Sequence, residues 1–219
     1  IRDAGGKAAT ACGDLSTDAG CAAVVAQAVA PFGGVDILVN NAGGSAATES
    51  PNWFTASTDS WIETYQRNTL AAMRLIHLLV PAMRDRGWGR IINIGTAAST
   101  TPTSGQADYG PAKAAMLNMS LGLSKALKQS GVTVNTVSPG MIRTEGLTRI
   151  LEKMAEKRGW GDDLGKAEDY IAKAGGQTVS RVGEVHDIAY AVTMLASPRA
   201  DFFNGINFHA DGGLSPSIY

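Results

Sequence analysis

The chain has 219 residues, 44% of them hydrophobic and 18% charged, which is enough for one globular domain with a sizeable core. Its 19 basic and 20 acidic residues give a formal net charge of -1, so it lacks the basic footprint that nucleic acid or an anionic membrane requires. Cys12 and Cys21 are too few for a disulfide framework and fit a reducing compartment. We therefore expect one cytoplasmic domain, residues 1–219, that acts on a small molecule.

Short strand-like runs alternate with longer helical stretches along the chain. Most of the strand-like runs are continuously apolar, as expected for strands that helices cover on both faces. This alternation predicts an α/β fold built from βα units around a parallel sheet. The predicted strands are 8–12, 35–40, 90–95, 132–138 and 206–210, and the predicted helices are 17–30, 58–84, 112–128 and 184–196. The apolar segment at 70–83 contains Arg74, His77 and Pro81 and is shorter than the roughly 20 apolar residues that span a bilayer.

Residues 145–181 interrupt the alternation directly after a predicted strand. The segment is long, charged and dotted with glycine. Insertions at the carboxyl ends of strands lie over the ligand crevice of an α/β sheet, so we predict that it is a substrate lid. Its apolar residues predict an apolar wall and favour a hydrophobic ketone or secondary alcohol; they are Leu147, Ile150, Leu151, Met154 and Trp160.

Tyr109 and Lys113 lie four positions apart in DYGPAKAAM. Residues with this spacing share a helix face, so the phenol and the ammonium can reach one pocket. A neighbouring cation favours phenolate, and we expect Lys113 to lower the pKa of Tyr109 from about 10. Pro111 fits a helix only in its first turn, which predicts a helix start at 107–109. Alone, the pair is better explained by a partly exposed aromatic ring beside a solvated lysine, so its context has to decide.

Three further motifs supply the context. The sequence NNAG (40–43) follows a predicted strand, Thr96 stands thirteen residues before Tyr109, and NTVSPGMIRT occupies 135–144. Together with Asn68 and a closing Asp-Gly-Gly at 211–213, they match in order and spacing the motifs of a known family. From residue 8 to its end, the chain resembles the short-chain dehydrogenase/reductase family.

The resemblance implies a Rossmann-like, doubly wound parallel sheet and hydride transfer between NAD or NADP and a ketone or secondary alcohol. It assigns Tyr109 as the general acid and base, and Lys113 as the group that lowers the tyrosine pKa and binds the nicotinamide ribose. Asn68 is expected to hold a water that leads to this lysine; the less favoured alternative is an ordinary polar residue of a long helix. Thr96 stands where the family usually has serine; its hydroxyl can bind the substrate oxygen, while its methyl group crowds the pocket. Ser99 is the alternative hydroxyl.

The resemblance also implies a set of cofactor-binding residues. Asp14 matches the acid that binds the adenine amino group, but it fits equally well as an acid at the start of helix 17–30. The segment 40–43 is expected against the adenosine ribose, and 139–144 against the carboxamide, although Pro-Gly also fits a simple turn. The full set is Asp14, Leu15, Asn40, Asn41, Ala42, Gly43, Ile94, Tyr109, Lys113, Pro139, Gly140, Ile142 and Thr144.

One departure from the family pattern is large. The family's opening strand, its Thr-Gly-x-x-x-Gly-x-Gly turn and its second strand are not in this sequence. That turn binds the pyrophosphate through backbone N–H groups, and strand 8–12 needs the second strand as its neighbour. We therefore expect the natural protein to be longer. The residue that selects NAD or NADP, and any targeting peptide, are expected in the same upstream segment.

Several other function classes were weighed. His77, His186 and His209 are far apart, with no Cys or carboxylate at ligand spacing, so no metal site is expected. A serine hydrolase is disfavoured because the chain has no Gly-x-Ser-x-Gly elbow. The open alternative is a catalytically inactive scaffold or regulatory binding protein, favoured by Thr96 and the absent glycine turn. The joint presence of Tyr109, Lys113 and Asn68 favours the enzyme.

Residues 114–124, AAMLNMSLGLS, carry no charge. A helix that is apolar around most of its circumference is expected to be buried on more than one side. A second subunit would provide that cover, so we expect a homodimer, or the homotetramer that the resemblance implies.

Overall fold

A computed structural model describes residues 1–45, 53–105 and 107–216. Its sheet is parallel throughout, in the order β1-β2-β3-β4, so that the carboxyl ends of the strands lie along one edge. Asn40 pairs with Asn93, and Pro139 pairs with Ala210 near that edge. The α/β prediction is confirmed. The strands are β1 (Ile37–Asn40), β2 (Gly89–Ile94), β3 (Val132–Pro139) and β4 (Asn207–Ala210).

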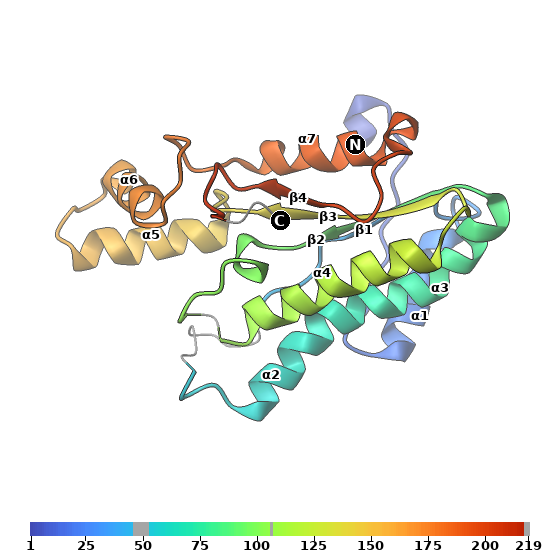
Figure 1. Ribbon diagram of the computed structural model, residues 1–219, viewed down its shortest axis with the longest axis horizontal. Coiled ribbons are helices and arrows are strands. Elements are labelled where there is room, and N and C mark those ends of the chain that lie inside the picture. Colours follow the sequence, from blue (N-terminus) through green and yellow to red (C-terminus); the bar gives the residue numbers. More distant parts are fainter. Residues whose placement is uncertain (46–52, 106, 217–219) are drawn as a thin grey trace.

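Helices cover both faces of the sheet, as Figure 1 shows. Alternate residues of a strand point to opposite faces, and each face has its own core. On one face Ile91 and Val134 pack with Met83 of α3, and on the other Ile92 and Val137 pack with α7. The first face carries α1 (Asp18–Val29), α3 (Ala71–Arg86) and α4 (Tyr109–Ala126), and the second carries α7 (Val185–Ala196). Short 3-10 helices lie at η1 (Arg2–Ala4), η3 (Ala97–Ser99) and η4 (Pro198–Ala200).

The helix ends follow local sequence signals. The hydroxyl of Thr17 accepts a hydrogen bond from the backbone N–H of Gly20 and so caps the start of α1. The chain leaves α3 through Gly87, whose φ of 71° is left-handed and suits glycine. Helix α4 begins at Tyr109, which confirms the predicted start and places Pro111 in the first turn.

The single helix predicted over 58–84 has an irregular turn in its middle. Helix α2 (Thr58–Tyr65) passes into a π-helical turn, η2 (Gln66–Leu70), before α3 begins. A π turn takes one more residue than an α turn, and such turns are frequent at functional sites. Asn68 and Thr69 are both buried in this turn.

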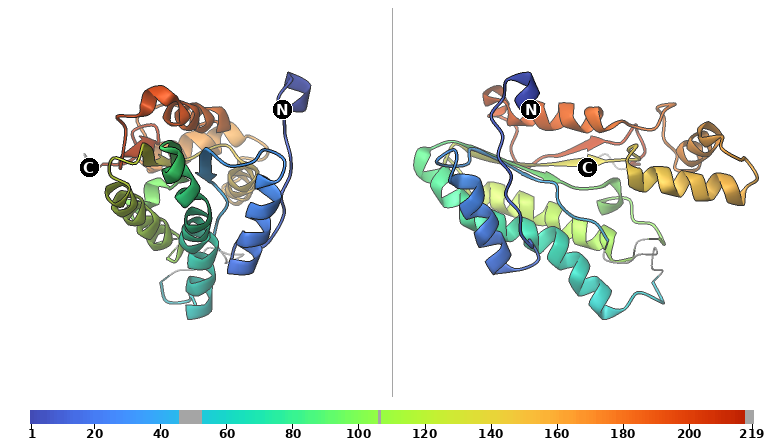
Figure 2. Two further views of the ribbon diagram at one scale, coloured as in Figure 1. Left: turned by 90° about the vertical axis from the view of Figure 1, so that its right-hand side faces the viewer. Right: turned by 180° about the vertical axis from the view of Figure 1, so that it is seen from behind.

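The strand predicted at 8–12 is wrong. This stretch has no strand partner among the described residues, and Figure 2 shows the dark blue N-terminal segment running outside the edge of the sheet. The side chain of Gln27 on α1 takes the place of a ladder: it accepts from the Cys12 N–H at 3.3 Å and donates to the Cys12 carbonyl at 3.1 Å. An extended segment without a neighbouring strand cannot form a sheet.

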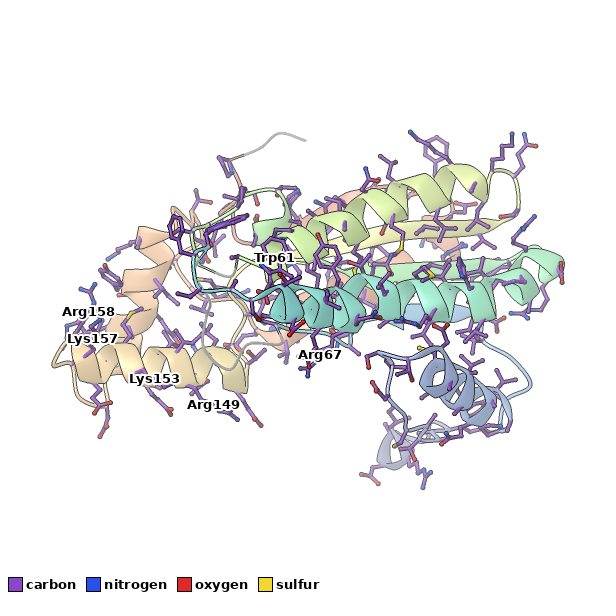
Figure 3. All side chains as sticks on the ribbon, turned by 90° about the horizontal axis from the view of Figure 1, so that it is seen from below. Trp61, Arg67, Arg149, Lys153, Lys157 and Arg158 are labelled. Atoms are coloured by element: carbon purple, nitrogen blue, oxygen red, sulfur yellow. The ribbon has the colours of Figure 1, made fainter. Side chains whose placement is uncertain are left out.

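The predicted lid segment folds into two helices, α5 (Glu145–Lys157) and α6 (Leu164–Ala174). They share a small core of their own around Leu151 and Ala167, both fully buried. Leu147, Met154 and Trp160 are partly buried against this core, and their role as an apolar wall of the substrate pocket stays a prediction. Figure 3 shows Arg149, Lys153 and Lys157 along the outer side of α5. Across the described residues, no helix is long and apolar enough to cross a membrane.

Candidate functional site

The Tyr109 and Lys113 side chains lie together at the carboxyl edge of the sheet. The Lys113 Nζ atom is 5.8 Å from the centroid of the Tyr109 ring. Lys113 is only 2% exposed, and its ammonium donates to the carbonyl of Ile94, the last residue of β2, at 2.7 Å. The predicted pair therefore shares one location.

Burial controls the ionisation of this pair. Removal from water lowers the pKa of Lys113 from 10.5 to about 8 and raises the pKa of Tyr109 above its ordinary value of 10. The predicted net lowering of the Tyr109 pKa is wrong for this structure, because desolvation of the phenol raises the pKa. At neutral pH the site therefore holds a protonated phenol beside an ammonium group.

Asn68 lies against the same pair. It is fully buried, and its Nδ2 donates to the carbonyl of Thr64 at 2.7 Å and to that of Gly44 at 2.8 Å. Its Oδ1 accepts from the Gly44 N–H at 3.1 Å. A Cβ atom at Gly43 would clash with Asn68 Oδ1 and would lie 3.4 Å from Lys113 Nζ. Only glycine fits there, and the loop after β1, the π turn and α4 meet at this point.

The residues of the NNAG motif divide into two groups. Asn40 is buried and donates from Nδ2 to Oδ1 of Asn93 at 2.7 Å, while Asn93 Nδ2 donates to Ser120 Oγ on α4 at 2.8 Å. These two hydrogen bonds join the end of β1 to β2 and to α4 and so fix its position. Residues 41–43 are exposed beyond the strand end and are accessible to a ligand.

Thr96 and Ser99 differ in what their hydroxyls can reach. Thr96 is half-buried at the end of β2 and caps η3, with its Oγ1 accepting from the Ala98 N–H at 3.4 Å. This turn lies against the first turn of α4, since a Cβ at Gly110 would be 3.3 Å from the Ala98 carbonyl oxygen. The Ser99 Oγ is buried and has no hydrogen-bond partner among the described residues. The Thr96 hydroxyl is thus half-buried at the end of β2, whereas the Ser99 hydroxyl is withdrawn from solvent, and the choice between them as the substrate contact stays a prediction.

The segment after β3 connects the sheet to α5 and α6. The Gly140 N–H donates to the Ala210 carbonyl at 3.1 Å, and a Cβ at 140 would lie 2.7 Å from the Asp211 Cα. Ile142 forms an isolated parallel bridge with Gly183. Thr144 caps α5 by accepting from the Leu147 N–H at 3.4 Å. Pro139 to Thr144 therefore lie at the carboxyl edge, where the resemblance places them.

Asp14 and Leu15 lie apart from this group, at the start of α1. The Asp14 Oδ1 accepts from Ser16 Oγ at 2.7 Å and from the Ser16 N–H at 2.9 Å, and these bonds lower the pKa of Asp14. The Leu15 carbonyl accepts from Cys21 Sγ at 3.3 Å. The described contacts of Asp14 are those of an acid at a helix start, and its adenine-binding role stays a prediction.

Asp108 is a further candidate site residue, to which the sequence assigned no role of its own beyond a place in segment 103–108 beside the expected substrate pocket. Its carboxylate is fully buried directly before Tyr109 and accepts hydrogen bonds from Thr64 and Ser60 of α2. The only sequence signal is its place in the DYGPAKAAM motif.

Comparisons with known proteins identify the relatives of this chain. The family model described as Enoyl-(Acyl carrier protein) reductase matches residues 1–215. A 3-oxoacyl-(acyl-carrier-protein) reductase from Vibrio cholerae is 34% identical over 183 residues, covering 84% of this chain and 68% of that protein. An acetoacetyl-CoA reductase from Rhizobium meliloti is 35% identical over 204 residues, covering 91% and 76%. The structure of L-sorbose reductase from Gluconobacter frateurii, complexed with NADPH and L-sorbose, superposes with a TM-score of 0.86 at 29% identity over 94% of this chain and 76% of that one.

Proposed function

The chain belongs to the short-chain dehydrogenase/reductase family, and we propose that it reduces a ketone to a secondary alcohol with NADPH, using Tyr109 as the acid. The observation that carries this proposal is the meeting of Lys113, Tyr109 and Asn68 beside a glycine turn at the carboxyl edge of the sheet. The choice of NADPH over NADH is supported by the bound NADPH of L-sorbose reductase.

The residues present fit a nicotinamide cofactor, which supplies the hydride when it is bound. An ammonium group has three N–H donors, and among the described residues Lys113 uses one of them, on the Ile94 carbonyl. The remaining donors suit ribose hydroxyls. We propose that Lys113, residues 41–43 and residues 139–144 hold the cofactor, with Asp14 and Leu15 near its adenine.

The proton chemistry follows from burial. Because the partly buried phenol stays protonated at neutral pH, Tyr109 can donate its proton to the carbonyl oxygen while the carbonyl carbon accepts the hydride. The Lys113 ammonium stabilises the phenolate that remains. The Thr96 hydroxyl is proposed to hold the carbonyl oxygen in place. Residues 145–181 are proposed to act as the substrate lid.

The test is a turnover assay. The chain is mixed with NADPH and a panel that contains a 3-oxoacyl thioester, a ketose and a simple hydrophobic ketone, and the loss of nicotinamide absorbance is followed. We expect NADPH consumption that depends on one member of the panel. Cofactor binding without turnover on any ketone would favour the inactive scaffold. The absence of NADPH and NADH binding by a protein that also carries the glycine-rich pyrophosphate turn upstream of residue 1 would reject the oxidoreductase, since this chain alone is expected to bind the cofactor weakly.

We also propose a homodimer or homotetramer. Leu121, on the outer side of α4, is 43% exposed within the uncharged run of this helix. The substitution Leu121→Glu is expected to give monomers in sedimentation velocity. Ile150→Glu, at a residue of α5 that is 54% exposed, is the control and should leave the assembly unchanged. A cytoplasmic location is proposed from the free thiols of Cys12 and Cys21.

A further inference from the structure

Asp108 is a buried carboxylate without a cationic partner. It is fully buried, and within the part of the chain that the structure describes no Lys, Arg or His forms an ion pair with it. A buried charge is costly unless hydrogen bonds and favourable dipoles compensate. The N-terminus of α4 supplies part of this compensation, because a helix dipole favours negative charge there.

The other compensation comes from hydroxyl groups outside its own helix. Thr64 Oγ1 donates to Asp108 Oδ2 at 2.7 Å, and Ser60 Oγ donates to the same oxygen at 2.9 Å. Ser45 Oγ, in the loop after β1, approaches Oδ1 at 3.4 Å. Although Asp108 stands at the N-cap position of α4, its side chain makes no capping hydrogen bond. The carboxylate therefore connects α4 to α2 and to the loop, and does not cap its helix.

This connection leads directly to Asn68. The Thr64 residue that donates to Asp108 also accepts, at its backbone carbonyl, the hydrogen bond from Asn68 Nδ2. On the other side of Asn68, Thr69 Oγ1 donates to the Ala112 carbonyl of α4 at 2.5 Å. Two contacts with α4 thus flank Asn68. One runs through Thr64 to the Asp108 carboxylate, and the other joins the neighbouring Thr69 to the Ala112 carbonyl.

We propose that Asp108 is a positioning residue: through Thr64 it sets the place of Asn68 relative to Lys113 and the Gly43–Gly44 turn. The inference rests on the proposed function, because it concerns the same site. It adds a residue that acts through another and does not touch the reacting atoms.

The test compares variants along this chain of contacts. Asp108→Asn removes the charge and one acceptor, and Thr64→Val removes the hydroxyl while keeping the shape of the side chain. We expect each to lower kcat by about 10- to 100-fold, the range that a displacement of catalytic groups by about 1 Å produces. The Kd for NADPH should stay near that of the wild type. Thr64→Ser, which keeps the hydroxyl, should restore kcat.

The double variant Asp108→Asn/Thr64→Val separates positioning from general stability. If the two residues act as one unit, the double variant should lose no more kcat than either single variant. Ser124→Ala is the matched control, because Ser124 is a buried α4 residue whose Oγ donates to the Leu121 carbonyl away from the site. It should lower Tm without lowering kcat. Additive losses, or a kcat that follows Tm across all variants, would overturn the proposal.

A second measurement does not depend on turnover. In asparagine-15N-labelled protein, the side-chain NH2 signals of Asn68 should shift in Asp108→Asn and Thr64→Val and stay in place in Ser124→Ala. Unchanged Asn68 signals in both variants would overturn the positioning role. If the two variants show these shifts but the wild type reduces no carbonyl compound, the positioning role stands and the proposed function fails.

Discussion

Two regions are built in opposite ways: the wall of the candidate site, by which we mean Asn68, Asp108, Tyr109 and Lys113 with the groups bonded to them, and the proposed lid, formed by α5 and α6. In the wall, buried polar groups from α2, η2, α4 and the strand ends bond to one another across the fold, and Asn68, Asp108 and Lys113 are almost fully withdrawn from solvent. In the lid, α5 and α6 pack on each other through an apolar core and expose basic and acidic side chains (Figure 3). The wall is costly to form and fixed in geometry, whereas the lid is nearly self-contained. The difference suggests that the chemistry resides in the wall and the choice of substrate in the lid.

The largest expected effect comes from Tyr109→Phe, in the wall. Loss of the proton donor should lower kcat by about 1,000-fold, within the range for general acid catalysis, while NADPH binding persists. Tyr190→Phe is the matched control, because Tyr190 lies on α7 and is 76% exposed. Steady-state kinetics and nicotinamide fluorescence measure the two quantities. Turnover retained in Tyr109→Phe would remove the wall from the chemistry.

The second effect concerns the free energy that it costs to bury the Lys113 ammonium in the wall. The folded chain binds the Lys113 proton less tightly than the unfolded chain, so the unfolded state carries more protons between about pH 8 and 10.5, and stability rises with pH in that window. The gain corresponds to roughly 3 kcal/mol.

Urea unfolding of Lys113→Met across this window should lack that rise. Lys125→Met, at an exposed position of the same helix, should keep it. Equal pH profiles for the wild type and Lys113→Met would show that the buried ammonium carries no such cost.

The third effect distinguishes the two candidate hydroxyls. Thr96→Val should lower kcat by about 100-fold, as expected when a donor to a developing oxyanion is lost. Thr96→Ser should remain close to the wild type because it keeps the hydroxyl. Ser99→Ala should have no effect on kcat, since the Ser99 Oγ is buried without a partner among the described residues. The reverse order of effects would assign the substrate contact to Ser99.

The smallest effect is expected at the base of the lid. Arg143 donates to Glu184 at 2.9 Å and to Glu168 of α6 at 2.8 Å, and these bonds raise the pKa of Arg143. Its side chain is 42% exposed, so Arg143→Ala should cost at most about 1 kcal/mol of stability.

We expect Arg143→Ala to increase hydrogen exchange in residues 145–174 and to raise KM with little change in kcat. Arg149→Ala, which removes an exposed pair with Glu145, is the control. A fall in kcat with KM unchanged would show that the lid base takes part in the chemistry.

Much of the architecture could be predicted from the sequence because short apolar runs and single helix-start residues determine it locally. The apolar runs at 35–40, 90–95, 132–138 and 206–210 contain or overlap the four observed strands, and Pro111 marked the start of α4. The prediction of a strand at 8–12 was wrong because a strand forms only beside a neighbouring strand, and a local sequence pattern does not reveal whether that neighbour is present. The π turn was not predicted, because the apolar spacing over 58–84 indicates a helix and does not reveal one extra residue in a single turn.

The site was predictable where the motif spacing carried it, as for Tyr109, Lys113 and Asn68. It was not predictable where a property of the site depends on residues that are distant in the sequence. The raised pKa of Tyr109 depends on how completely the fold buries the phenol. The role of Asp108 depends on hydroxyls more than forty positions away in the sequence.

The π turn at Gln66–Leu70 makes the site sensitive to the phase of a helix. Deleting one residue there would allow α2 and α3 to join as one regular helix and would rotate α2 by roughly 100° about the shared axis. Circular dichroism would barely change, yet Ser60 and Thr64 would turn away from Asp108. A single extra residue in one helical turn thus sets the rotation of α2 that directs the Ser60 and Thr64 hydroxyls toward Asp108.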